Sequence, residues 1–182
     1  EGKDFIGQAM FFRAFSHYEL LNFFARPYKF TSDASHLGVP YRLKPSNSVA
    51  TIDENIKLGR GTVAQNYTQL LSDLDTAENY MTSKTTKSTK NGIVYASKEA
   101  AIALKTRVYL SMGSYPKVVS EANKLVPASA PFVATSGVAN KLVSDYSLIF
   151  KTPYTTDESI FSMPFTTGSG DVPGTQNGLQ GY

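Results

Sequence analysis

The chain has 182 residues, of which 41% are hydrophobic and 18% are charged, and its net charge is +3. This length suffices for one domain with a core or for part of a larger one, and the lack of cysteine excludes disulfides, thiolate metal sites and a cysteine nucleophile within the chain. The excess positive charge is scattered and not interleaved with aromatic residues, so we expect no nucleic-acid partner.

The first predicted element is a helix within the stretch 6–28, and we expect it to end before Pro27 because the residue before a proline is pushed out of the α region. Two adjacent apolar stripes follow the helical spacing. They consist of Ala14, Tyr18, Leu21 and Ala25, and of Phe5, Ala9, Phe12 and Phe15. An ordinary surface helix has one such stripe, so we expect contacts on two sides. Arg13, His17 and Glu19 interrupt any run of the roughly 20 apolar residues that a membrane span needs.

Residues 28–61 contain several prolines and glycines and are predicted to form a long loop, partly pinned to the body by the apolar patch at 37–41. A second helix is predicted to follow, with Thr62 as N-cap and Gln65 completing a capping box. Its apolar face recurs at the helical period. That face comprises Val63, Tyr67, Leu70, Leu74, Ala77 and Met81.

The polar stretch 83–92 is predicted to be a solvated loop, with anion binding as the less favoured alternative. A third helix is predicted from the N-cap Ser97 to the terminating residue Gly113. A fourth begins with Pro116 in its first turn and ends at Pro127. These two helices form an antiparallel hairpin over residues 97–126, close to the length of about 34 residues of a tetratricopeptide (TPR) repeat.

The repeat match is partial. Its aromatic, glycine and small positions are filled by Tyr109, Gly113, Tyr115 and Ala122, whereas the opening Trp and the Leu-Gly pair of the repeat are absent. Beyond Pro127, residues 145–150 are predicted to form one or two helical turns and residues 158–165 a short strand. The Gly/Ser/Thr-rich stretch 166–181 is predicted to be a loop.

Several sequence blocks together point to a known family. In chain order they read GQAMFFRAFSHYELLNFFARPY, RGTV followed by YTQLLSDLDTAENYM, SKEAAIALKTRVYLSMGSYPKVVSEANKLV, and DESIFSMPF. Over residues 7–165 this order closely resembles the SusD/RagB family of outer-membrane nutrient-binding lipoproteins. The most family-typical part is the first block, with Gly7, Arg13 and Ala14 at its core.

The resemblance implies a mainly α fold, a TPR-like array of α-helical hairpins with long loops and little or no β-structure. It further implies that residues 1–182 are an interior fragment of one SusD-like domain. Within it we expect helical pairs at 3–82 and 97–126 and a loop-rich extension at 127–182.

For function, the resemblance implies a non-catalytic protein without cofactor or metal that binds oligosaccharide at the cell surface. Such proteins pass their ligand to a TonB-dependent, SusC-like outer-membrane transporter. The expected location is the outer membrane, as a surface-exposed lipoprotein whose lipid anchor lies outside this fragment. The alternative is a plain TPR-like scaffold that binds another protein and no glycan.

The long loop supplies the candidate ligand-binding residues Tyr28, Phe30, Tyr41 and Arg42. Aromatic faces stack on the C–H faces of sugars, while polar groups fix the orientation of a ligand. A competing interpretation, which we favour for Tyr28 and Tyr41, is that these side chains anchor the loop to the helices. The family's glycan platform often uses Trp, and this chain has none. We therefore expect part of the ligand contacts outside the fragment.

The sequence offers no catalytic candidate. His17 is expected to be a structural histidine in a packed helix and His36 an exposed loop residue, and the two lack ligand-type spacing. Arg13 and Arg60 are expected to make an ion pair or a cap contact. Asp73 and Asp75 lie two residues apart on a helix, so they point to different faces and do not form a carboxylate pair.

Overall fold

The computed structural model describes residues 2–84, 92–134, 140–151 and 156–162. These ranges contain no β-ladder, only two isolated bridges, and five α-helices. The helices are α1 (Gly2–Phe24), α2 (Val49–Lys57), α3 (Val63–Tyr80), α5 (Lys98–Met112) and α6 (Tyr115–Leu125). Three short 3₁₀ turns accompany them, Tyr28–Phe30, Gly92–Val94 and Tyr146–Phe150. The predicted mainly α fold is confirmed.

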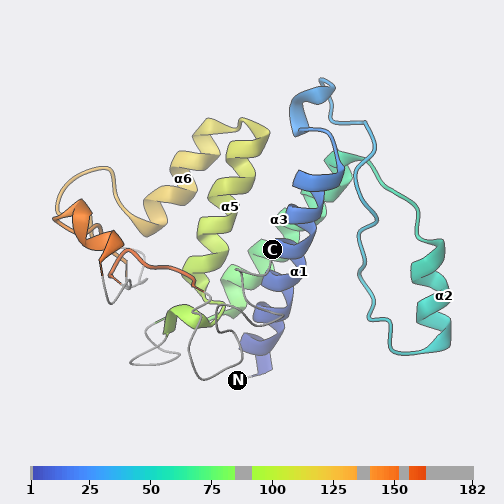
Figure 1. Ribbon diagram of the computed structural model, residues 1–182, viewed down its shortest axis with the longest axis horizontal. Helices are drawn as coiled ribbons and strands as arrows, with labels where there is room; N and C mark the ends of the chain where they lie inside the picture. The colour runs from blue at the N-terminus through green and yellow to red at the C-terminus, as the bar shows by residue number, and fades with distance from the viewer. Residues whose placement is uncertain (1, 85–91, 135–139, 152–155, 163–182) are drawn as a thin grey trace, which may run out of the picture.

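Four of the helices form an array (Figure 1). In it, α3 packs against both α1 and α5, and α6 packs on α5, while α2 stands apart at the end of two long loop segments. The core lies where the facing sides of α1, α3 and α5 meet. This is the arrangement expected of consecutive helical hairpins.

Helix α1 buries one side only. Ala14, Tyr18 and Leu21 of the first predicted stripe are buried, together with Phe11. The prediction of contacts on a second side is wrong at Phe5, which is 69% exposed, whereas Phe12 keeps an edge-on contact with Phe161 and Phe15 packs against the core. The physical reason is position, because α1 is the outermost helix of the array and α3 covers only its inner side.

Helix α3 follows its sequence signals closely. The Thr62 hydroxyl accepts from the Gln65 N–H at 3.1 Å, and the Gln65 amide oxygen accepts from the Thr62 N–H at 2.9 Å. This pair of bonds satisfies N–H groups that a helix start would otherwise leave unpaired. The whole predicted apolar face is buried. The same buried side also carries Asp73, a carboxylate that is not part of the predicted apolar face.

The predicted loop 28–61 contains a helix that the sequence analysis missed. Helix α2 starts at the N-cap Ser48, whose hydroxyl accepts from the Thr51 N–H in a reciprocal capping box. Its apolar residues do not form a buried face, since Val49 is 78% exposed and the buried residue is Asn55. Val49, Ile52 and Ile56 nevertheless recur at the helical period, so the sequence carried a signal for this short helix.

The hairpin of α5 and α6 is confirmed. The Ser97 hydroxyl accepts from the Ala100 N–H at the start of α5. Gly113 ends α5 with φ of 67°, a left-handed conformation that costs glycine little. Pro116 sits in the first turn of α6, where its missing N–H is harmless.

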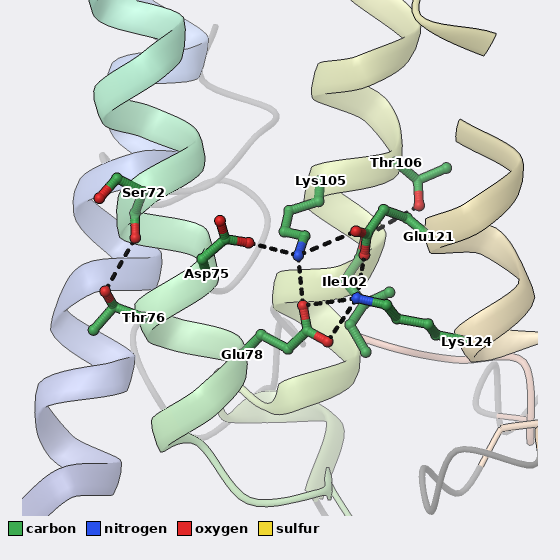
Figure 2. A network of polar contacts seen from close by, with 9 residues as sticks. All are labelled: Ser72, Asp75, Thr76, Glu78, Ile102, Lys105, Thr106, Glu121 and Lys124. Carbon is green, nitrogen blue, oxygen red and sulfur yellow. Dashed lines mark hydrogen bonds and ion pairs between the residues drawn. The ribbon is translucent and has the colours of Figure 1, made fainter. Parts of the chain in front are cut away.

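A network of ion pairs fastens this hairpin to α3 (Figure 2). Lys105 on α5 reaches Asp75 at 2.7 Å and Glu78 at 2.6 Å on α3, and Glu121 on α6 at 3.2 Å. Lys124 on α6 lies 2.9 Å from both Glu78 and Glu121. Burial of Glu78 opposes its ionisation, yet hydrogen bonds from the two lysines outweigh this and lower its pKa. The charges of α3, α5 and α6 therefore lock the register of the hairpin.

The polar stretch 83–92 is not a solvated loop at its start. Lys84 is buried, and its ammonium donates to the Asn140 side chain at 2.7 Å and to the carbonyls of Ser159 at 2.6 Å and Asp157 at 3.3 Å. Burial lowers the pKa of Lys84. The solvated-loop prediction is therefore wrong at this residue, while residues 85–91 lie outside the described ranges. Lys84 ties the segment around residue 159 to the helical array.

The predicted strand 158–165 is wrong over its described part, residues 158–162, which has no strand partner. Residues 163–165 and the predicted loop 166–181 lie outside the described ranges. Ile160 and Phe161 enter the groove between α1 and α5, where the Phe161 ring lies 5.7 Å from that of Phe11. The Ser162 N–H donates to the Ile93 carbonyl at 2.9 Å. The predicted helical turn at 145–150 is confirmed.

Candidate functional site

The main candidate site is a cavity of about 650 Å³ where the second half of α1 meets the following loop. This volume falls in the range of about 300–1,000 Å³ found for small-molecule sites. The residues that line it are His17, Leu20, Phe24, Val39, Pro40, Arg42 and Arg60. Its walls combine apolar side chains with two guanidinium groups.

His17 holds the loop against α1. Its Nδ1 lies 2.8 Å from the Arg13 carbonyl and its Nε2 lies 3.2 Å from the Arg42 backbone nitrogen. A carbonyl only accepts and a backbone N–H only donates, so the proton belongs on Nδ1. The Tyr41 ring stacks on the imidazole with centroids 3.8 Å apart. His17 is therefore a structural histidine, as predicted.

Asp73 is the second anchor of the loop. Its carboxylate accepts from Arg13 at 2.6 and 2.7 Å, from the Tyr41 hydroxyl at 2.8 Å and from Gln69 at 2.9 Å. The predicted ion pair of Arg13 is thus confirmed. The hydrogen bond to Asp73 raises the pKa of Arg13. Burial, reinforced by the charge of Asp73, raises the pKa of Tyr41.

Arg60 binds the loop through backbone carbonyls and makes no ion pair within the described ranges. Its guanidinium donates to Gly38 at 2.5 Å, to Leu37 at 3.3 Å and to Phe24 at 3.4 Å. The last contact caps the carboxyl end of α1. A Cβ on Gly38 would come within 1.9 Å of the Asn66 side chain, so this close approach requires glycine.

Asn66 holds Val39, one of the loop residues that line the cavity. Its side chain accepts from the Val39 N–H at 2.8 Å and donates to the Val39 carbonyl at 3.0 Å. The Asn66 amide thus satisfies both backbone groups of Val39, as a neighbouring β-strand would. His36 also differs from its prediction, because it is half-buried and bonded to Thr31 at 2.9 Å.

The four sequence-predicted ligand residues do not form one cluster. Tyr28 packs edge-on against Tyr67, with ring centroids 4.9 Å apart, and Tyr41 packs on His17. Phe30 is 59% exposed, and the Arg26 guanidinium lies 5.3 Å from its ring. Of the four, Arg42 alone lines the cavity.

Comparison with known proteins bears on the whole arrangement. Residues 1–110, which include α1, the loop and α3, match the model of the SusD-like family described as "starch-binding associating with outer membrane". The chain belongs to the SusD-like family. No curated protein matches it in sequence.

Solved structures agree with this membership. A SusD superfamily protein from Bacteroides thetaiotaomicron is 27% identical, with a TM-score of 0.68 over 90% of this chain. A putative sugar-binding protein from Bacteroides vulgatus is 30% identical, with a TM-score of 0.52 over 66% of this chain. The SusD-like chain spans 32% of the first structure and 24% of the second.

Sequence reasoning missed several residues of the site in this SusD-like chain. Asp73 follows Leu70 by three residues and Asn66 by seven, which places all three on the buried side of α3 and was a readable signal. Leu20 and Phe24 lie four residues apart on α1, outside both predicted stripes. Nothing local marked them, because the loop that makes them cavity residues arrives from a distance in sequence.

Two further observations concern the described ranges of the SusD-like chain. They contain no group of three or more side chains suited to hold a metal ion. None of their helices has the length and apolar character that crossing a bilayer demands.

Proposed function

We propose that the protein containing this chain binds oligosaccharide at the cell surface without catalysis and delivers it to a TonB-dependent, SusC-like outer-membrane transporter. The observation that carries the proposal is the family match over residues 1–110, because this stretch builds the cavity. The similarity to a protein described as sugar-binding adds support.

Within the chain, the residues contribute in two ways. Leu20, Phe24 and Pro40 offer apolar surface to the C–H face of a sugar ring, and Arg42 offers hydrogen-bond donors. Phe30 is exposed and available for a second contact. Tyr28 and Tyr41 act on the ligand indirectly, by holding the loop that carries Arg42.

The carboxylates support a binding role without hydrolysis. Glycosidases need two carboxyl groups about 5–9.5 Å apart across the sugar. None of the described residues that line the cavity is an aspartate or glutamate. Asp73 pairs with Arg13, and Asp75 pairs with Lys105. The two carboxylates therefore do not form such a pair.

The groove between α1 and α5 bears on the alternative of a protein-binding scaffold. A TPR-like adaptor would use such a groove for a peptide. Here Ile160 and Phe161 of the chain itself lie in it, against Phe11 and Leu104. An incoming peptide would have to displace them, which favours glycan binding over the adaptor.

The test is calorimetry on the full-length protein with malto-oligosaccharides and a panel of plant, host and microbial glycans. Phe24→Ala removes an aromatic wall of the cavity and should weaken binding about tenfold or more. Phe23→Ala is the matched control, because Phe23 is 78% exposed against 68% for Phe24 and does not line this cavity. If no glycan binds and a peptide binds in the groove between α1 and α5, the alternative of a protein-binding scaffold is established. Co-purification with a TonB-dependent, SusC-like transporter tests delivery.

A further inference from the structure

The charged side chains among the residues that line the cavity are both positive. Arg42 and Arg60 both line it, and no carboxylate is among the described residues that line it. His17 is engaged on both ring nitrogens and presents no free polar atom. The cavity therefore offers an arriving molecule positive charge next to the apolar side chains of Leu20 and Phe24.

The two arginines differ in what they can still bind. Arg60 already donates to the carbonyls of residues 24, 37 and 38, so it is a fixed charge at the rim. The Arg42 guanidinium has no hydrogen bond or ion pair with any described residue. Its backbone, in contrast, is held by the bond from its N–H to His17 at 3.2 Å. Arg42 thus combines a positioned backbone with an unengaged head group.

We propose that this cavity takes an acidic sugar, whose carboxylate pairs with the Arg42 guanidinium while its ring lies on Leu20, Phe24 and Pro40. The inference rests on the proposed function and names its ligand class. A guanidinium and a carboxylate form two parallel hydrogen bonds, a geometry that a neutral hydroxyl does not match. Arg60 adds attraction without needing direct contact.

The hydrogen-bonding inventory points the same way. A neutral sugar presents hydroxyl groups that both donate and accept, and a good site supplies acceptors as well as donors. Arginine supplies donors only. The carbonyls of residues 37 and 38 beside the cavity are already occupied by Arg60. The available polar groups therefore suit an anionic ligand better than a neutral one.

The experiment compares trigalacturonate with its methyl ester by calorimetry on the full-length protein, at low and high salt. The two probes share the same sugar chain, and the ester replaces each carboxylate with an uncharged methyl ester. We expect the acid to bind about tenfold more tightly or better, because a charge-assisted pair is roughly twice as strong as a neutral hydrogen bond. The preference should shrink as salt rises.

Arg42→Ala should abolish the preference for the acid, and Arg42→Lys should keep part of it. Arg107→Ala is the control, since Arg107 is an exposed arginine on α5 that does not line this cavity. Equal binding of acid and ester, or a preference that survives Arg42→Ala, overturns the inference while leaving glycan binding standing. If no glycan of any charge binds, the proposed function fails as well.

Discussion

Replacing Asp73 with alanine tests the anchor of the cavity loop. The side chain is 3% exposed and accepts hydrogen bonds from Arg13, Tyr41 and Gln69. Alanine would leave the Arg13 guanidinium and the Tyr41 hydroxyl without this acceptor. Because Tyr41 lies beside Arg42, the loss should loosen the loop as well as the helix pair.

The magnitude follows from the burial of the two charges. Removing one partner of a buried ion pair costs about 3–5 kcal/mol of folding free energy. Arg13 is 23% exposed, so water can partly rehydrate it. We therefore expect Asp73→Ala to lower the free energy of unfolding by about 3 kcal/mol, a large part of the 5–15 kcal/mol typical of a domain.

The matched control is Asp75→Ala, two residues along the same helix. Asp75 is 58% exposed, and Lys105 keeps Glu78 and Glu121 when it is removed. Asp75→Ala should therefore lower the free energy of unfolding by less than about 1 kcal/mol. Urea unfolding of the full-length protein measures the free energy of unfolding of both variants. Hydrogen exchange should speed up around Tyr41 in Asp73→Ala alone. Equal losses in the two variants would refute the argument that Asp73 is the anchor.

Three further predictions concern the helical array. Leu74 is fully buried, so Leu74→Ala should cost about 2–5 kcal/mol in urea melts, and a loss near zero would contradict its place in the core. Gly113→Ala forces a side chain into a left-handed conformation and should cost about 1–2 kcal/mol, measured as a fall in the urea midpoint. Glu78 has a lowered pKa, so its stabilising contribution is present above the glutamate pKa of the unfolded chain and is lost as pH falls through the lower folded value. The stability gap between wild type and Glu78→Gln should therefore narrow on acidification, and a gap that stays constant in unfolding curves down to pH about 3 would exclude this linkage.

Helix starts and ends were predictable where the signal lies within a few residues. The Thr62–Gln65 capping box, the N-cap Ser97 and the left-handed Gly113 are all satisfied by neighbours in sequence. The apolar face of α3 was predictable for the same reason, since its period is a local property. Helix α2 was missed although its N-cap Ser48 and the spacing of its apolar residues were readable, because it is only nine residues long and lies within a stretch that contains several prolines and glycines.

The candidate site was predictable only in part. The sequence indicated that the loop after α1 carries Arg42 and that Tyr41 anchors it, as its contacts with His17 and Asp73 show. It did not indicate that Leu20 and Phe24 share a cavity with Arg42. The sequence likewise predicted a solvated Lys84, because its partners at residues 140 and 157–159 are more than fifty positions away.

The amino-acid sequence by itself determined the helices of the array, their caps and the family to which the chain belongs, since each depends on residues close together or on their order. Tertiary structure alone decided which polar groups distant in sequence form hydrogen bonds or ion pairs. A buried charge such as Asp73 or Lys84 must find a partner wherever the fold brings one. Those distant pairings place the loop on α1 and so create the cavity.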